Sequence, residues 1–204
     1  MSPRHSAILA SLLLIGAVLL VSPRVMTDPD ALTNLALGRH IHEAGAVPGH
    51  DPFTFSAPDL AWRSPEWLGA LAWYGLHSAG GEGAMQQGKL GLLALAWVLL
   101  LLLCLRRGAT PWIALGVLLL FLPGAAWRFT LRNHLHAFWL VPLYGLLLAR
   151  ARQAANPRAM TGWLLALLPA AILWANLHAS FVLGWLLLGA AALDAWRAGE
   201  GRLA

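Results

Sequence analysis

Six apolar runs dominate this chain, and one long polar stretch separates the first run from the others. The runs cover residues 7–22, 85–105, 111–127, 134–149, 161–177 and 179–196. A run of roughly 20 apolar residues has the length of a helix that crosses a bilayer. Backbone groups in hydrocarbon must pair within their own segment, so each run is predicted to be a helix. The pattern predicts an all-α integral membrane protein, a single transmembrane domain over 1–204 with about six spans.

Composition supports the membrane class. The chain is 59% hydrophobic and 11% charged, whereas soluble domains carry roughly a quarter charged residues. The single cysteine, Cys104, excludes an intramolecular disulfide and a cysteine metal site. Lys and Arg together number 14 against 9 acidic residues, but the arginines gather at the ends of apolar runs. That placement sets topology and argues against a nucleic-acid partner.

The first run is short, and Arg4 and His5 precede it, as in a signal peptide. Pro23 and Arg24 follow Ser22 directly and make a poor cleavage site, so we expect an uncleaved first span. With six alternating spans, most arginines fall on one side, which the positive-inside rule assigns to the cytoplasm. We therefore expect a membrane protein with a cytoplasmic N-terminus and an outward-facing loop over 23–83. The arginines on the cytoplasmic side are Arg4, Arg106, Arg107, Arg150, Arg152, Arg158, Arg197 and Arg202.

The outer loop is predicted to be ordered. Asp28 followed by Pro29 is a helix start, and Gly45 suits a helix end. A helix over 31–44 would have its apolar face on Leu32, Leu35, Ala36 and Ile41. Ser64, Pro65 and Glu66 signal a second helix over 65–78, which is too short to span and should lie in the membrane interface. Two such helices would cover the bundle as a lid.

The loop also holds seven of the nine acidic residues. We expect Asp28 and Asp30 to lie on the outward-facing surface of the membrane. There either one can act as a general base or help to hold a divalent cation. Helix capping by Asp28 and dipole complementation by Asp30 are the alternative. Glu66, between Trp62 and Trp67, is a second candidate acid or a helix N-terminal acid.

A cationic set is expected on the same outer face. Arg128 and Arg132 lie in a short outward connection, and guanidinium groups bind phosphate oxygens; headgroup binding or helix capping is the alternative. His134 is a further candidate, whereas His134 and His136, two residues apart on a helix, point in different directions, so no two-histidine metal site is expected. Asn176 and His178, expected to form the turn of a tight hairpin, are candidates for turn formation or substrate binding.

The loop resembles the first outer loop of bacterial GT-C-type multi-spanning membrane glycosyltransferases. The matching pattern is Asp28-Pro-Asp30, Leu35, Gly38-Arg39, Ile41, Gly45, Val47-Pro48 and Asp51-Pro-Phe53-Thr-Phe55. Trp62, Glu66-Trp67-Leu68, the outer arginines and Trp174-Ala-Asn176-Leu-His178 continue the resemblance over most of the chain.

This resemblance implies transfer of a sugar from a polyprenyl-phosphate donor to an acceptor on the outer face. Asp28 or Asp30 would be the acid, Glu66 a second carboxylate, and Arg128 and Arg132 the phosphate contacts. A divalent cation is a possible cofactor, and the expected partners are the polyprenyl-phosphate lipid, membrane lipids and a second membrane subunit.

Two alternatives remain open. GT-C proteins usually have more spans, so the chain would be an N-terminal portion or a shortened member. Pro65 and Ala179 depart from the family's histidine and glycine at those positions, which favours a non-catalytic subunit or lipid-glycan-binding protein. A third possibility, a transporter, would need ionisable residues within its membrane spans. Gly-x-Ser-x-Gly, His-Glu-x-x-His and Ser-x-x-Lys motifs do not occur in the sequence, so hydrolase and zinc-protease functions receive no support.

Overall fold

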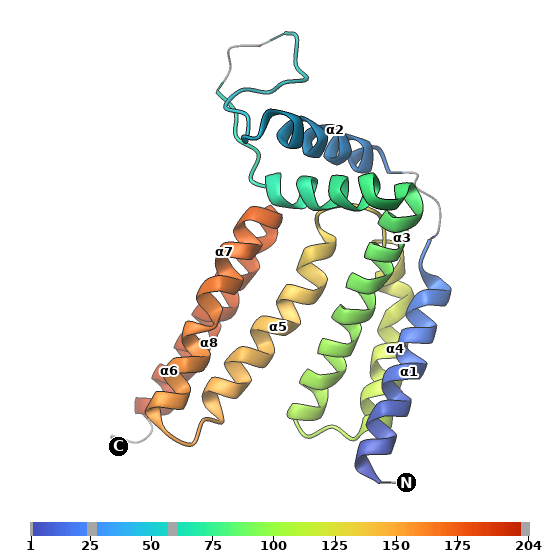
Figure 1. Ribbon diagram of the computed structural model, residues 1–204. Coiled ribbons are helices and arrows are strands. Elements are labelled where there is room, and N and C mark those ends of the chain that lie inside the picture. Colours follow the sequence, from blue (N-terminus) through green and yellow to red (C-terminus); the bar gives the residue numbers. More distant parts are fainter. Residues whose placement is uncertain (1, 24–27, 57–60, 201–204) are drawn as a thin grey trace.

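The computed structural model describes residues 2–23, 28–56 and 61–200, and within these residues the chain is helical (Figure 1). The pairing of His50 with Ala61 is an isolated β-bridge, and no strand occurs in the described segments. The predicted all-α class is confirmed. The helices are α1 Pro3–Val21, α2 Pro29–Ala44, α3 Trp67–Arg106, α4 Pro111–Ala126, α5 Leu135–Arg152, α6 Pro157–Leu165, α7 Leu167–Leu177 and α8 Val182–Glu200, with a 3₁₀ turn η1 at Ala179–Phe181.

The helices form an upright bundle covered at one end by a crosswise layer (Figure 1). The layer consists of α2 and the first part of α3; the other helices run lengthwise. In the described segments, four stretches are long and apolar enough to cross a membrane, and α4 is a shorter apolar helix. The four stretches are Pro3–Val21, Trp67–Arg106, Pro157–Leu177 and Ala179–Gly199. The chain thus has the architecture of a membrane protein, and the count of six spans stays a prediction.

A glycine pair turns α3 from crosswise to lengthwise. Gly80 and Gly81 have non-helical backbone angles inside α3, and the φ of Gly81 is +63°. This left-handed conformation is readily available to glycine because it has no Cβ atom. The helix expected over 65–78 is therefore present as the first part of α3, which begins at Trp67; its place in the membrane interface stays a prediction.

Close backbone contact fixes α2 against the crosswise part of α3. A Cβ atom on Gly38 would lie 2.2 Å from the carbonyl oxygen of Ala70. The buried face of α2 contains Ala31, Gly38 and Ile41. The face expected from the sequence was partly wrong, because Leu32 and Ala36 are exposed. The contact at the small residue Gly38, and not the positions of the leucines, sets the rotation of α2.

Two apolar clusters hold the lengthwise helices together. The first joins α1, α3 and α4 and includes Leu14, Leu93 and Trp97. At its end nearest the crosswise layer, the buried Lys89 side chain donates to the carbonyl oxygen of Pro23, just beyond α1. The second cluster joins α5 and α7, where the rings of Tyr144 and Trp174 meet edge to face at 5.2 Å.

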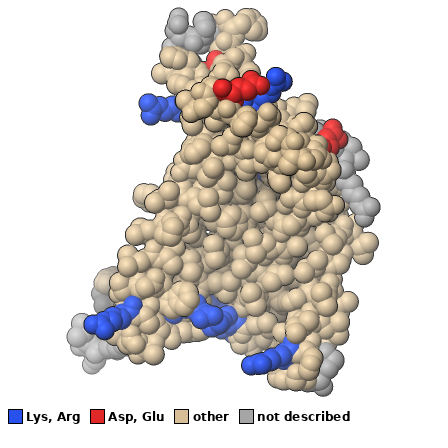
Figure 2. Space-filling view, viewed as in Figure 1, with Lys and Arg blue, Asp and Glu red and all other residues tan. Residues whose placement is uncertain are grey.

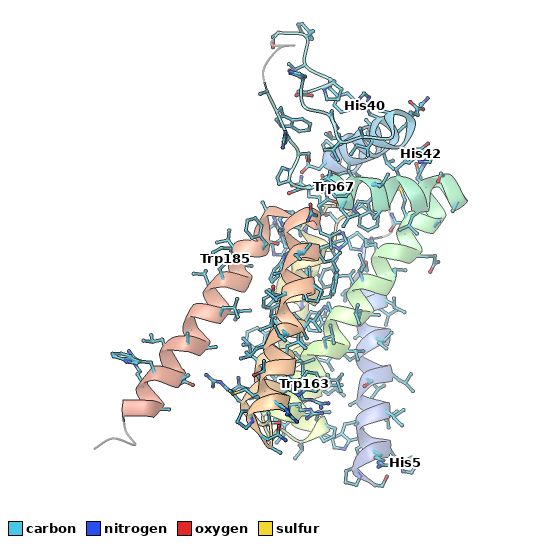
Figure 3. All side chains as sticks on the ribbon, turned by 60° about the vertical axis from the view of Figure 1, so that its left-hand side comes forward. His5, His40, His42, Trp67, Trp163 and Trp185 are labelled. Atoms are coloured by element: carbon cyan, nitrogen blue, oxygen red, sulfur yellow. The ribbon has the colours of Figure 1, made fainter. Side chains whose placement is uncertain are left out.

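The last two expected spans differ from the prediction. The run 161–177 is divided at Ala166 into α6 and α7. The turn after α7 consists of His178 and η1, so Asn176 and Leu177 belong to the helix and not to the turn. Instead of forming a tight hairpin with α7, α8 leans away from α6 and α7 toward its C-terminal end, and Trp185 points away from the bundle (Figure 3).

Acidic residues gather mainly at the crosswise end of the bundle, whereas Lys and Arg occur at both ends (Figure 2). The arginines that the sequence assigned to one side lie near helix ends opposite the crosswise layer, at what we call the arginine end. Six of the nine acidic residues, from Asp28 to Glu82, belong to or flank the crosswise layer. Asp59 and Arg202 lie outside the described residues.

Replacing Gly38 with alanine is predicted to destabilise the protein, because the added methyl group has no room against Ala70. We expect a loss of about 1–3 kcal/mol, as for other overpacked sites. Gly75→Ala is the matched control: nothing lies within 4 Å of its would-be Cβ atom, and alanine is the better helix former. Thermal unfolding in detergent would measure both; an equally stable Gly38→Ala variant would contradict the proposed contact.

Candidate functional site

Asp28 connects the crosswise layer to the connection between α4 and α5. Its side chain caps α2 by accepting from the backbone N–H of Asp30 at 3.1 Å, and it forms an ion pair with Arg132. Burial raises the pKa of Asp28, but hydrogen bonds from Arg132, Asp30 and Thr130 outweigh this effect and leave the pKa below its usual value. Asp28 is thus a charged, capping and poorly basic carboxylate.

Asp30 is the more accessible of the two aspartates. Its carboxylate lies 3.1 Å from Arg132 Nη1, and its side chain remains 57% exposed, against 8% for Asp28. The sequence left open whether Asp28 caps the helix or takes part in chemistry. The capping role of Asp28 is confirmed, but both aspartates share Arg132.

Asn133 is the buried centre of the site, with only 1% of its surface exposed. The indole N–H of Trp73 donates to Asn133 Oδ1 at 2.9 Å. Because an indole can only donate, this contact fixes the orientation of the Asn133 amide. Its Nδ2 group then donates to Asn34 at 2.9 Å and to Glu66 at 3.0 Å. One side chain thereby joins α2, the start and the middle of the crosswise part of α3, and the connection that leads into α5.

Glu66 receives a second hydrogen bond from His178. The backbone N–H of Ser180 donates to His178 Nδ1 at 3.0 Å, so the neutral ring carries its proton on Nε2. That nitrogen lies 3.3 Å from Glu66 Oε1 and donates to it. Burial lowers the pKa of His178 and Arg128 lowers it further, while Glu66 raises it; the net effect is a lowered pKa. The ring is therefore neutral at neutral pH.

Arg128 and His134 complete the cationic side of the site. His134 Nε2 lies 2.8 Å from the carbonyl oxygen of Arg128. The guanidinium of Arg128 lies 4.8 Å from the ring centre of Trp127 and is exposed. Among the described residues, no carboxylate forms an ion pair with Arg128, whereas Arg132 has two such partners. Arg128 is thus the arginine available for an anionic ligand.

These side chains surround one cavity of about 180 Å³. Six of the eight residues predicted as site residues line it, although they come from positions far apart in the sequence. The lining residues are Asp30, Asn34, Glu66, Arg128, Arg132, Asn133, His134 and His178. Asp28 is not among the lining residues, but it forms an ion pair with Arg132, which is.

Asn176 is the predicted site residue that faces elsewhere. It accepts a hydrogen bond from Trp67 Nε1 and donates to Ile172 O, both at 2.7 Å. Trp67 lies where the crosswise layer meets the lengthwise helices (Figure 3). Asn176 therefore fastens the start of α3 to α7 and lines a separate cavity, together with Val47 and Arg63.

Two further points concern metal binding. His136 is buried against Trp73 and Trp139 and does not line the cavity, in accord with the expectation that it and His134 do not share a pocket. Within residues 2–23, 28–56 and 61–200, no group of three or more His, Cys, Asp or Glu side chains is arranged to hold a metal ion. A divalent cation stays an untested possibility.

Sequence reasoning missed Asn34 and Asn133, the two amides of the site. The available signal was their setting: Asn133 stands between Arg132 and His134, immediately before an apolar run, where a polar side chain needs partners. Comparisons with protein-family models, with curated proteins and with solved structures found no match.

The Asp28–Arg132 ion pair predicts a pH dependence. A carboxylate with a depressed pKa in the folded protein stabilises the fold above its unfolded pKa of about 4, and this contribution is lost as the pH falls through the folded value. The melting temperature should therefore fall on acidification below about pH 4. Asp28→Asn keeps the cap but loses the charge, so its profile should be flatter. An unchanged acid-induced loss in that variant would contradict the assignment.

Asn133→Ala is predicted to cost about 1–3 kcal/mol of stability, because the buried Trp73 N–H loses its acceptor. Gln87→Ala, which removes an exposed amide from α3, is the control and should have little effect. Chemical unfolding in mixed micelles, followed by circular dichroism, would give both values. Equal stabilities for the two variants would show that Asn133 does not hold the layers together.

Proposed function

We propose that this protein is a GT-C-like membrane glycosyltransferase that moves a sugar from a polyprenyl-phosphate donor to an acceptor at the crosswise layer. The observation that carries the proposal is the gathering of Asp30, Glu66 and Arg128 around one cavity at the end of an apolar bundle. Carboxylates suit proton removal from a hydroxyl, and an exposed guanidinium suits a phosphate. The resemblance of the loop supplies the reaction class.

In the proposed reaction, the acceptor hydroxyl oxygen attacks the anomeric carbon of the donor sugar. The bond between that carbon and the phosphate oxygen breaks, and its electron pair leaves with the polyprenyl phosphate. Asp30, the more exposed aspartate, takes the hydroxyl proton. Arg128 neutralises the charge that develops on the phosphate, while Asp28 and Arg132 position Asp30 and do not touch the substrate.

The proposed setting is the bacterial inner membrane, with the arginine end in the cytoplasm and the crosswise layer outside. The arginine end carries arginines with few acidic residues among them, which supports this orientation through the positive-inside rule. A polyprenyl chain lies in the bilayer with its phosphate at the surface, which is the level that this orientation gives to Arg128. The donor would therefore reach the cavity from the membrane.

A second candidate function is binding of a lipid-linked glycan without transfer, as a non-catalytic membrane subunit. The specific observation in its favour is that two aspartates already neutralise Arg132, which leaves Arg128 for the phosphate. The cavity of about 180 Å³ is also small for two substrates. Donor binding without turnover distinguishes this function from the first.

Transfer would be measured on the full chain in vesicles that contain radiolabelled polyprenyl-phosphate sugars, by following label that leaves the donor. Asp30→Asn is expected to lower the rate about 10²–10⁴-fold. Arg128→Gln should weaken donor affinity about tenfold through the lost charged hydrogen bonds, and Arg106→Gln at the arginine end is the control. Binding without release of label would favour the second candidate, and neither binding nor release would refute both.

A further inference from the structure

A larger cavity adjoins the cationic one and has a different chemical character. It has a volume of about 310 Å³ and shares Asp30, Asn34 and Glu66 with its neighbour. Such a volume lies within the usual range for small-molecule sites. The remaining lining residues are Thr33, Leu37, Asp51, Phe53, Trp62 and Ser64.

The charges along this lining disfavour an anionic ligand. Every charged residue among its described lining residues is a carboxylate: Asp30, Asp51 and Glu66. Carboxylates accept hydrogen bonds and repel phosphate. All cationic lining residues of the two cavities face the smaller one. The smaller cavity, with its arginines, is therefore the one suited to phosphate. The larger cavity is suited to a neutral ligand that donates hydrogen bonds.

Aromatic side chains give the larger cavity an apolar surface. Trp62 is half-buried because it packs against the cluster of Leu37, Ile41 and Ala70. Phe53 is 50% exposed, and its backbone N–H donates to Asp51 Oδ1 at 3.0 Å. The backbone of Trp62 is tied to Gly49 by a hydrogen bond of 2.8 Å. The two rings thus come from both arms of the loop.

A ligand that fits this lining has hydroxyl groups and an apolar face. The hydroxyls of a sugar donate to carboxylate and amide oxygens, and its C–H face can lie against an aromatic ring and lose contact with water. We infer that the cavity between Trp62, Phe53 and Asp51 is a subsite for a neutral sugar, separate from the phosphate site at Arg128. Under the proposed function, on which this assignment rests, it holds the acceptor, with the attacking hydroxyl toward Asp30.

The experiment measures binding of neutral oligosaccharides, chitotriose and maltotriose, to the full chain in nanodiscs by ligand-observed NMR. Thr33→Phe adds bulk to the cavity from an exposed position of α2 and should abolish binding. Trp62→Phe should weaken it several-fold. Trp112→Phe, which changes an exposed tryptophan on α4, is the control and should bind normally.

Further results decide between the assignments. Arg128→Gln should leave oligosaccharide binding unchanged while weakening the donor, which separates this subsite from the phosphate site. Sugar binding without transfer would sustain the subsite and refute the proposed transferase activity. No oligosaccharide binding, binding unaffected by Thr33→Phe, or displacement by ethanolamine at lower concentration than by sugar would overturn the inference, the last by indicating a cationic ligand.

Discussion

The buried amide of Asn133 is the contact on which the arrangement of the two layers depends. Its oxygen accepts from Trp73, and its nitrogen donates to Asn34 and Glu66. A buried amide that loses a partner is costly, so the four side chains favour a single relative position. A Cβ atom on Gly69 would lie 2.7 Å from Asn133 Oδ1, so the crosswise part of α3 lies directly on this network. The candidate site is therefore held by buried hydrogen bonds and not by the loop alone.

Charge neutralisation within the site determines which groups remain available. Arg132 is taken up by Asp28 and Asp30, and Glu66 is held by Asn133 and by a neutral His178. The groups that remain accessible are Asp30, which is largely exposed although it pairs with Arg132, and the exposed guanidinium of Arg128. This division gives the site a directed polarity: Asp30 and Glu66 line both cavities, but the two arginines line only the smaller one. Of the seven loop carboxylates, Asp28, Asp30 and Glu66 belong to the candidate site, and each has different surroundings.

Much of the fold followed from local sequence signals, whereas the site followed from them only in part. The apolar runs and the Asp28–Pro29 cap are local signals: the cap predicted the start of α2, and the runs predicted helices, although 161–177 is divided into α6 and α7. The face of α2 was missed because a long-range contact, Gly38 against Ala70, decides it. Asn133 was missed for the same reason, since its partners lie 60 to 99 positions away in the sequence.

The partial failure at Asn176 illustrates how a polar residue beside an apolar run can be misread. Its position near His178 suggested a shared pocket or turn. In the structure, Asn176 bonds to Trp67, whereas His178 contacts Glu66. Asn176 accepts an indole N–H where the crosswise layer meets α7, and His178 orients a carboxylate. Both roles need a polar group at a helix end, so sequence position alone cannot separate them. The end of α7 separates the two roles, because Asn176 lies within the helix whereas His178 follows it with an extended backbone.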